Sequence, residues 1–136
     1  MPRSEEQFKQ IREKTKLLIV TTALSLFAKK GYKGTSIQDI AKEAGISKGL
    51  AYNYFESKEK LAEAVLNTLR IEIEKLYSDS VSIEDPKLQL KMVIEATFRN
   101  LIENETYWNL YMSFAMQAEI INLSGKKLGS FLSDAF

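Results

Sequence analysis

Hydrophobic residues recur three and four positions apart along most of this chain, and polar residues fill the positions between them. That spacing is typical of helices that bury one face. The pattern predicts an all-α protein with helices over residues 4–30, 36–44, 48–54, 58–77 and 86–103. Residues 78–85 predict a polar loop. Two further helical segments are predicted over residues 106–121 and 126–136, on either side of a turn at 122–125.

Residues that cap helices mark most of these boundaries. A serine or threonine followed three positions later by glutamine can form a capping box, which fits Ser4 with Gln7 and Thr35 with Gln38. Aspartate followed directly by proline, at residues 85–86, is typical of a helix start. Further predicted caps are serines at helix starts and glycines just after helix ends: Ser47, Ser57, Gly31 and Gly45.

The two short predicted helices, 36–44 and 48–54, are separated by a tight turn at Gly45. Ala41 and Ala44 are small enough to let these helices approach closely. Gly49 lowers helix stability by about 1 kcal/mol relative to alanine, so a backbone that must lie close to another surface explains it better than stability does. This layout is that of a helix-turn-helix, whose second helix enters the major groove of DNA.

Side chains of the second short helix suit DNA recognition. Lys48, Gly49, Tyr52 and Asn53 lie near its start or on one side, beside the Ser47 hydroxyl. Lysine can donate to guanine, asparagine can pair with adenine, and tyrosine and serine hydroxyls can hold phosphates. For Tyr52 and Tyr54, packing in the core and phosphate contact remain open alternatives, whereas Phe55 is expected in the core.

The sequence resembles the TetR-type (TetR/AcrR) family of transcriptional regulators. The segments that carry the resemblance are Ala23–Phe27, Lys30–Tyr32, Thr35-Ser36, Asp39–Ala41, Ala44–Gly49, Tyr52–Phe55 and Ser57–Leu61. The resemblance implies a DNA-binding domain over residues 1–57 and a helical regulatory domain over 58–136. It implies a dimeric protein, usually a repressor, that binds a near-palindromic operator and releases it when a small molecule binds the C-terminal helices.

The resemblance also implies roles for individual residues. Base contacts are expected near Lys48, Gly49, Tyr52 and Asn53. Phosphate contacts are expected from Thr35, Ser36, Ser47, Tyr54 and Lys58. The family normally continues through two more long helices that form a dimer interface, so we expect the 136 residues to be part of a longer protein.

Composition narrows the function classes. The chain has no cysteine and no histidine, which removes disulfides, thiolate nucleophiles and the commonest general base and metal ligand. We therefore expect neither an enzyme nor a cofactor. No apolar run approaches the ~20 residues of a membrane span, and we expect a cytoplasmic protein with no membrane partner.

Charge is distributed unevenly along the chain. Residues 1–60 contain 12 Lys and Arg against 7 Asp and Glu, a net charge of +5, whereas residues 61–136 have a net charge of −4. The basic amino-terminal half predicts that a surface that binds a polyanion lies in the same half of the chain as the helix-turn-helix. Cations crowd the start of the first helix, where they form either a solvated face or a contact with the DNA backbone: Arg3, Lys9, Arg12, Lys14 and Lys16.

The segment 106–121 is rich in aromatic residues and methionine, which suit a cavity for varied apolar ligands. The candidate ligand-binding residues are Phe98, Trp108, Tyr111, Met112 and Met116. Ordinary core packing is the alternative for each of them. For the whole chain, the alternative to a regulator with a small apolar or amphipathic effector is a helical ligand-binding or protein-interaction domain that has lost DNA recognition.

Overall fold

The computed structural model describes residue 2 and residues 4–135, and for residues 128, 131, 132, 134 and 135 it describes the backbone alone. Over this range the chain is helical and contains no strand. Arg3, one of the cations noted at the start of the first helix, and Phe136, the end of the last predicted helix, lie outside the described residues. The helices are α1 (Glu5–Lys30), α2 (Ile37–Ala44), α3 (Lys48–Tyr54), α4 (Lys58–Tyr77), the short 3-10 helix η1 (Ser78–Ser80), α5 (Pro86–Glu103), α6 (Glu105–Ala115) and α7 (Ala118–Ala135).

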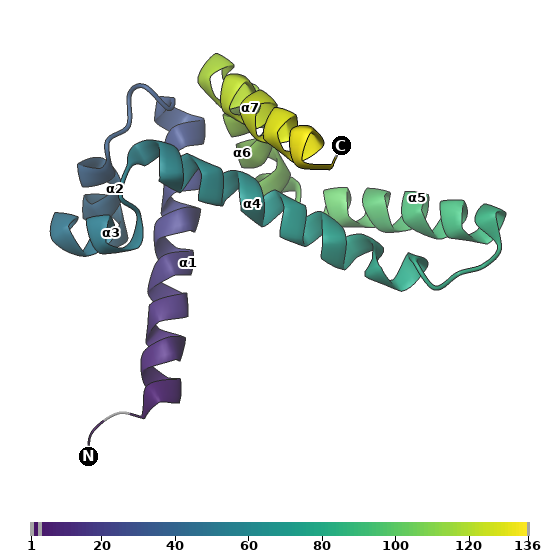
Figure 1. The fold of residues 1–136 in the computed structure, drawn as a ribbon, viewed down its shortest axis with the longest axis horizontal. Helices are drawn as coiled ribbons and strands as arrows, with labels where there is room; N and C mark the ends of the chain where they lie inside the picture. Colours follow the sequence, from purple (N-terminus) through teal and green to yellow (C-terminus); the bar gives the residue numbers. More distant parts are fainter. Residues whose placement is uncertain (1, 3, 136) are drawn as a thin grey trace.

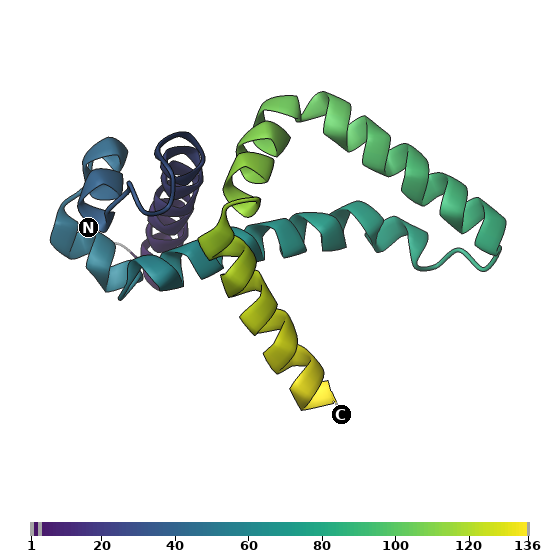
Figure 2. The same cartoon turned by 90° about the horizontal axis from the view of Figure 1, so that it is seen from above.

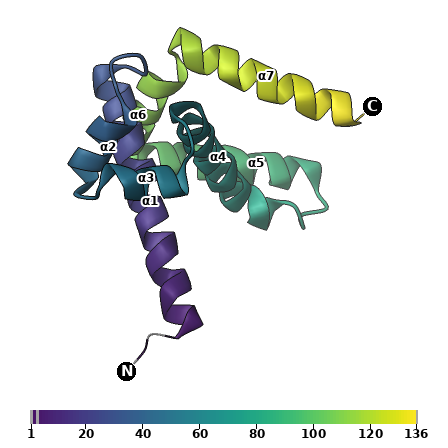
Figure 3. The ribbon, with the colours of Figure 1, turned by 60° about the vertical axis from the view of Figure 1, so that its left-hand side comes forward.

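Helices α1 and α4 cross near the end of α1 and the start of α4, and their far ends diverge (Figure 1). Helices α2 and α3 pack beside the end of α1, away from the long arm of α4 (Figure 1). Helix α5 doubles back from the far end of α4, and α6 returns the chain to α1 (Figure 2). Helix α7 then leaves this junction in a different direction (Figure 3).

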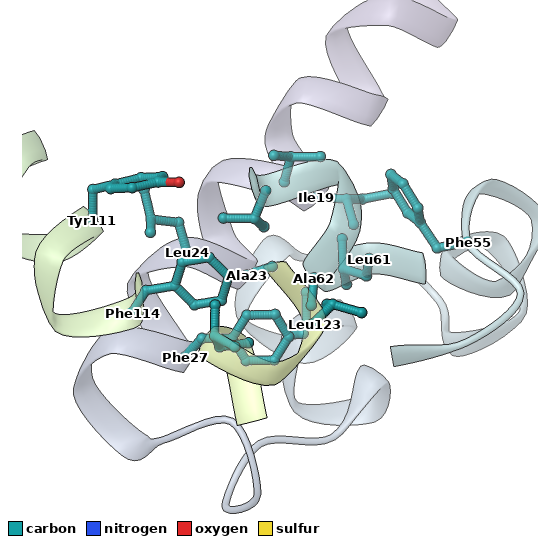
Figure 4. Close-up of a cluster of buried hydrophobic side chains, with 14 residues drawn as sticks. Ile19, Ala23, Leu24, Phe27, Phe55, Leu61, Ala62, Tyr111, Phe114 and Leu123 are labelled. Atoms are coloured by element: carbon teal, nitrogen blue, oxygen red, sulfur yellow. The ribbon is translucent and has the colours of Figure 1, made fainter. Parts of the chain in front are cut away.

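The main hydrophobic core lies where α1, α4, α6 and α7 meet (Figure 4). Its fully buried members include Phe27 of α1, Val65 of α4 and Phe114 of α6. The Phe27 and Phe114 rings stack with centroids 5.8 Å apart. Phe55 also belongs to this core, as the sequence predicted. The core therefore joins the helix-turn-helix segment to the helices that follow it.

A second, smaller cluster holds α2 against α3. It consists of Ile37, Ala41 and Ala51, with the half-buried Ile46 packed against them. Two of these residues are alanines, whose small side chains let α2 and α3 pack closely. The geometry agrees with the helix-turn-helix predicted from residues 36–54.

The start of α2 differs from the prediction. Ser36, not Thr35, caps the helix, and its capping-box partner is Asp39, not Gln38. Thr35 is unavailable as a cap because its side chain is buried and its hydroxyl donates to the Gly31 carbonyl oxygen at 2.8 Å. The other predicted caps, at Ser4, Ser47, Ser57 and Asp85, are confirmed.

The predicted turn at residues 122–125 is also wrong. The chain breaks earlier, at Met116 and Gln117, and α7 runs without interruption through Gly125. Ile120 and Leu123 of the first turns of α7 are buried in the main core, and this packing outweighs the local preference of Gly125 for a turn. Within the residues that the structure describes, none of the helices is long and apolar enough to span a membrane.

Candidate nucleic-acid interface

Helix α3 is fixed by contacts at its start and on its inner side. The Ser47 hydroxyl oxygen caps it by accepting a hydrogen bond from the Leu50 backbone N–H at 3.1 Å. Gly45 precedes this cap with a φ of 72°, a left-handed conformation that glycine adopts without strain. Ala51 is buried against α2. Because this side faces the protein, the opposite side of α3 faces solvent.

The structure brings four of the predicted base-contacting residues together on that solvent-facing side. Lys48, Gly49 and Asn53 are exposed, and Tyr52 is 44% exposed. A Cβ atom added at Gly49 would meet nothing within 4 Å. Packing within the described protein therefore does not require glycine at position 49.

The predicted phosphate-contacting residues fall into two groups. Ser36 and Ser47 are exposed at the starts of α2 and α3. Thr35 is buried with its hydroxyl committed to Gly31, so its side chain does not offer a hydrogen bond to a phosphate in this structure. Tyr54 is half-buried against the main core, and the Arg12 guanidinium lies 5.1 Å from its ring centroid. Tyr54 thus packs, whereas Tyr52 stays accessible.

Lys58 is held in place by the loop that follows α1. Its Nζ donates to the Tyr32 carbonyl oxygen at 2.9 Å and lies 4.3 Å from the Tyr32 ring centroid. The same lysine lines a hollow of about 330 Å³ together with Ser36, Tyr52 and Lys33. Lys33 was not among the predicted site residues, and its side chain is 83% exposed. Two lysines, a serine and a tyrosine around one hollow are suited to an anionic oxygen.

The carboxylates of Asp39 and Glu119 offset part of the positive charge around this hollow. The hydrogen bond from the Ser36 backbone N–H lowers the pKa of Asp39, so this residue stays ionised at the start of α2. The pKa of Glu119 is lowered mainly by a backbone hydrogen bond and further by Lys33, whose Nζ lies 3.3 Å from its carboxylate. Lys33 is therefore shared between the hollow and α7.

The predicted ligand-binding residues do not gather in the large cavity. This cavity, of about 960 Å³, lies between α1, α4 and the start of α6, and Trp108 is the only one of the five that lines it. Tyr111 is buried in the main core. Phe98, Met112 and Met116 lie on the surface and are more than half exposed. Richness in aromatic residues and methionine showed that this region is apolar but not which way each side chain points.

The comparisons with known proteins agree with this geometry. Residues 19–65 match the family model of bacterial regulatory proteins, tetR family. Residues 19–65 thus carry the helix-turn-helix segment of the TetR family. The matched range contains α2, the glycine turn, α3 and the start of α4.

Among the described residues, no cluster of three or more Asp and Glu side chains could hold a metal ion.

The chain matches only part of the length of each of its relatives. The chain is 37% identical over 106 residues to the uncharacterized HTH-type transcriptional regulator YuxN of Bacillus subtilis, a match that covers 75% of this chain and 35% of YuxN. Among solved structures, NalD, the secondary repressor of the MexAB-OprM multidrug efflux pump in Pseudomonas aeruginosa, is 26% identical with a TM-score of 0.67. That match covers 88% of this chain and 62% of NalD.

A gamma-butyrolactone receptor described as ArpA-like is 27% identical with a TM-score of 0.64, over 78% of this chain and 55% of the receptor. The chain thus spans about a third of YuxN and somewhat more than half of the two solved structures.

Proposed function

We propose that the protein is a DNA-binding transcriptional regulator rather than an enzyme, and that it acts in the cytoplasm on double-stranded operator DNA. Residues 1–57 bind the DNA and residues 58–136 regulate that binding. The observation that carries the proposal is the solvent-facing side of α3, where Lys48, Tyr52 and Asn53 surround a glycine that protein packing does not require. The match of residues 19–65 to the TetR family model and the exposed caps of α2 and α3 support it.

In this proposal α3 enters the major groove. Lys48 donates to a guanine and Asn53 pairs with an adenine, while Gly49 lets the backbone approach the bases. Ser36, Ser47, Tyr52 and Lys58 hold the phosphates on either side of the groove. The buried Thr35 side chain takes no part, and Tyr54 acts by packing rather than by contact with phosphate.

The finer parts of the proposal concern assembly and control. The protein acts as a repressor, binds a near-palindromic site as a homodimer, and responds to a small apolar or amphipathic effector. Support comes from relatives: NalD is a repressor of an efflux pump, and another solved relative is a receptor for gamma-butyrolactone. A dimer would place its two α3 helices in successive major grooves, about 34 Å apart.

The test is a titration of the purified chain with its own upstream promoter DNA and with a scrambled duplex, each at two salt concentrations. We expect preference for the promoter that persists at the higher salt. Lys48→Ala and Asn53→Ala should reduce that preference by roughly 5- to 150-fold, the equivalent of about 1–3 kcal/mol for one base contact. Lys87→Ala, at the exposed start of α5, is the matched control and should change nothing.

The opposite result would favour the alternative function. Equal, weak and salt-sensitive binding to both duplexes, unchanged in the α3 variants, would leave only a basic surface. The protein would then be a helical ligand-binding or protein-interaction domain whose helix-turn-helix serves the fold alone.

A further inference from the structure

The large cavity is a cleft lined by residues of α1, α4 and the start of α6. Helices α1 and α4 diverge from their crossing point (Figure 1). The volume of the cleft, about 960 Å³, lies within the range of small-molecule sites. Apolar side chains from three helices line its walls: Leu17, Val20 and Leu24 of α1, Ile71 of α4, and Tyr107 and Trp108 of α6. The cleft therefore offers two aromatic rings and four aliphatic side chains to one occupant.

The aromatic end of the cleft is fixed in orientation. The Trp108 indole N–H donates to the Asn100 side-chain oxygen at 2.7 Å. The Tyr107 ring packs edge-on against the indole with centroids 5.4 Å apart. A rigid pair of rings is suited to flat or cyclic apolar groups, since little conformational freedom is lost when they are contacted.

One polar group at this end lacks a good hydrogen bond. The Tyr107 hydroxyl is shielded from water and makes no hydrogen bond of ordinary geometry to the described residues. The Thr68 hydroxyl donates to the Val65 carbonyl oxygen at 2.6 Å, but it lies close enough to Tyr107 to lower the pKa of that residue and can act toward it only as a weak acceptor. Burial raises the pKa of Tyr107, so the group stays neutral and can both donate and accept. A buried hydroxyl without a good hydrogen bond is destabilising, and a bound molecule that supplies one removes that penalty.

The charges at the rim of the cleft cancel. Three glutamates and three lysines line it: Glu6, Glu13, Glu72, Lys9, Lys14 and Lys75. Lys75 and Glu72 already form an ion pair with atoms 3.8 Å apart. With no excess of either sign, the rim favours neither an organic anion nor a cation. A neutral molecule fits this balance best.

We propose that the α1–α4 cleft binds a neutral, amphipathic small molecule with a ring system and one hydrogen-bonding group. The rings lie against Trp108 and Ile71, and a small shift of the Tyr107 side chain lets its hydroxyl bond to the molecule. The proposal rests on the ligand response proposed above and assigns it a site.

The position of the cleft gives the bound molecule a route to the DNA-binding helices. Residues of α1 from Glu6 to Leu24 form one wall of the cleft, while Phe27 and Ile19 of the same helix anchor α1 in the core beside α2 and α4. A molecule held between α1 and α4 fixes the angle between them. Because α2 and α3 are carried by the end of α1, that angle sets where the recognition helix stands.

The probe for the test is N-phenyl-1-naphthylamine, a neutral fluorophore with two ring systems and one N–H group. Its anionic analogue, 1-anilinonaphthalene-8-sulfonate, is the charge control. Trp108 is the only tryptophan of the chain, so quenching of its emission reports on binding. We expect the neutral probe to bind at least about tenfold more tightly than the anionic one, and tighter binding of the anionic probe would overturn the proposal.

Site-directed variants separate the cleft from other apolar surface. Leu17→Gln and Ile71→Gln alter partly exposed walls of the cleft and should each weaken the neutral probe by about five- to tenfold. Ile102→Gln alters an α5 residue that is 76% exposed and does not line the cleft, and it should leave affinity unchanged. Loss in the Ile102 variant alone, or equal affinity in all variants, would place the probe elsewhere and overturn the proposal.

The Tyr107 hydroxyl has its own test. Tyr107→Phe should weaken the neutral probe by about three- to tenfold while leaving the urea midpoint of the free protein unchanged or higher, because the lost hydroxyl made no hydrogen bond of ordinary geometry. A lower midpoint with unchanged probe affinity would assign the hydroxyl a purely structural role. Promoter DNA titrated without probe tests the proposed function separately, since each variant can keep DNA binding and lose the probe, or the reverse.

Discussion

Gln117 holds the peptide of Tyr32, a residue 85 positions away in the sequence. Its side-chain oxygen accepts a hydrogen bond from the Tyr32 backbone N–H at 2.7 Å, and its side-chain nitrogen donates to the Phe27 carbonyl oxygen at 2.6 Å. Between Phe27 and Tyr32, α1 ends at Lys30 and Gly31 caps it with a φ of 84°. Lys58 bonds the Tyr32 carbonyl oxygen from the other side. The corner between α6 and α7 is thereby fastened to the loop that leads into α2.

Gln117→Ala should lower the free energy of unfolding by about 1–3 kcal/mol, because it leaves the partly buried Tyr32 N–H and Phe27 carbonyl without their side-chain partner. Urea denaturation followed by circular dichroism measures this. Gln38→Ala, at an exposed position of α2, is the control and should change stability by less than about 0.5 kcal/mol. Equal stability of the two variants would mean that the bridge contributes nothing.

Ser36→Ala should destabilise the protein by about 1 kcal/mol, since its hydroxyl caps α2 by accepting from the Asp39 backbone N–H at 3.0 Å. Gln38→Ala should not, although the sequence pattern favoured Gln38 as the capping-box partner. Thermal melts of the two variants decide between these assignments. A larger loss in the Gln38 variant would restore Thr35 and Gln38 as the cap.

Asp39 gives the same cap a dependence on pH. Its pKa is lowered in the folded protein by the Ser36 backbone N–H, so its contribution to stability is present above its unfolded pKa and is lost as pH falls through the folded value. The difference in stability between the wild type and Asp39→Ala should therefore be full at pH 7 and shrink below about pH 4. A difference that stays constant down to pH 2 would show that the charge of Asp39 is not involved.

These caps show which parts of the fold could be read from the sequence. Ser4, Ser47, Ser57 and Asp85 were predicted correctly because each cap depends on atoms a few residues away. At the start of α2, two adjacent residues fit the same spacing. The choice of Ser36 over its neighbour depends on burial and on a bond to Gly31, both set by tertiary packing.

The same division holds for the candidate sites. The exposed side of α3 follows from local spacing around Ala51, so Lys48, Tyr52 and Asn53 could be placed in advance. The cleft could not, because it depends on the angle between α1 and α4. Gln117 gave no signal either: a single amide within an apolar segment does not reveal that its partners lie some 90 positions earlier.

Tyr111 should make stability fall at alkaline pH. Burial raises its pKa to about 12 in the folded protein, whereas the unfolded value is about 10. Between these values the unfolded chain releases the proton and the folded protein keeps it, so the Tyr111 contribution is full below pH 10 and is lost as pH rises toward 12. The loss should approach about 1.4 kcal/mol per pH unit.

Urea midpoints between pH 9 and pH 11.5 test this, with Tyr111→Phe as the variant that lacks the ionising group. The stability of the wild type relative to Tyr111→Phe should decline across this range. Tyr52→Phe removes a tyrosine that is 44% exposed and serves as the control. Parallel pH profiles for the wild type and both variants would show that burial of Tyr111 does not shift its ionisation.

Gly49 should separate stability from DNA binding. Alanine there has room, since an added Cβ meets nothing within 4 Å, and it is a better helix former by up to about 1 kcal/mol. Gly49→Ala should therefore stabilise the free protein. The same methyl group would stand between the α3 backbone and the bases, so promoter affinity should fall by about tenfold or more.

Gly125→Ala is the matched control for this combination of higher stability and lower promoter affinity. Gly125 lies within α7, far along the chain from the interface, and an added Cβ there also meets nothing within 4 Å. This variant should gain stability by a similar amount and keep its affinity for promoter DNA. If Gly49→Ala gained stability and also kept promoter affinity, the backbone of α3 would not approach DNA closely, and Gly49 would have no part in the proposed interface.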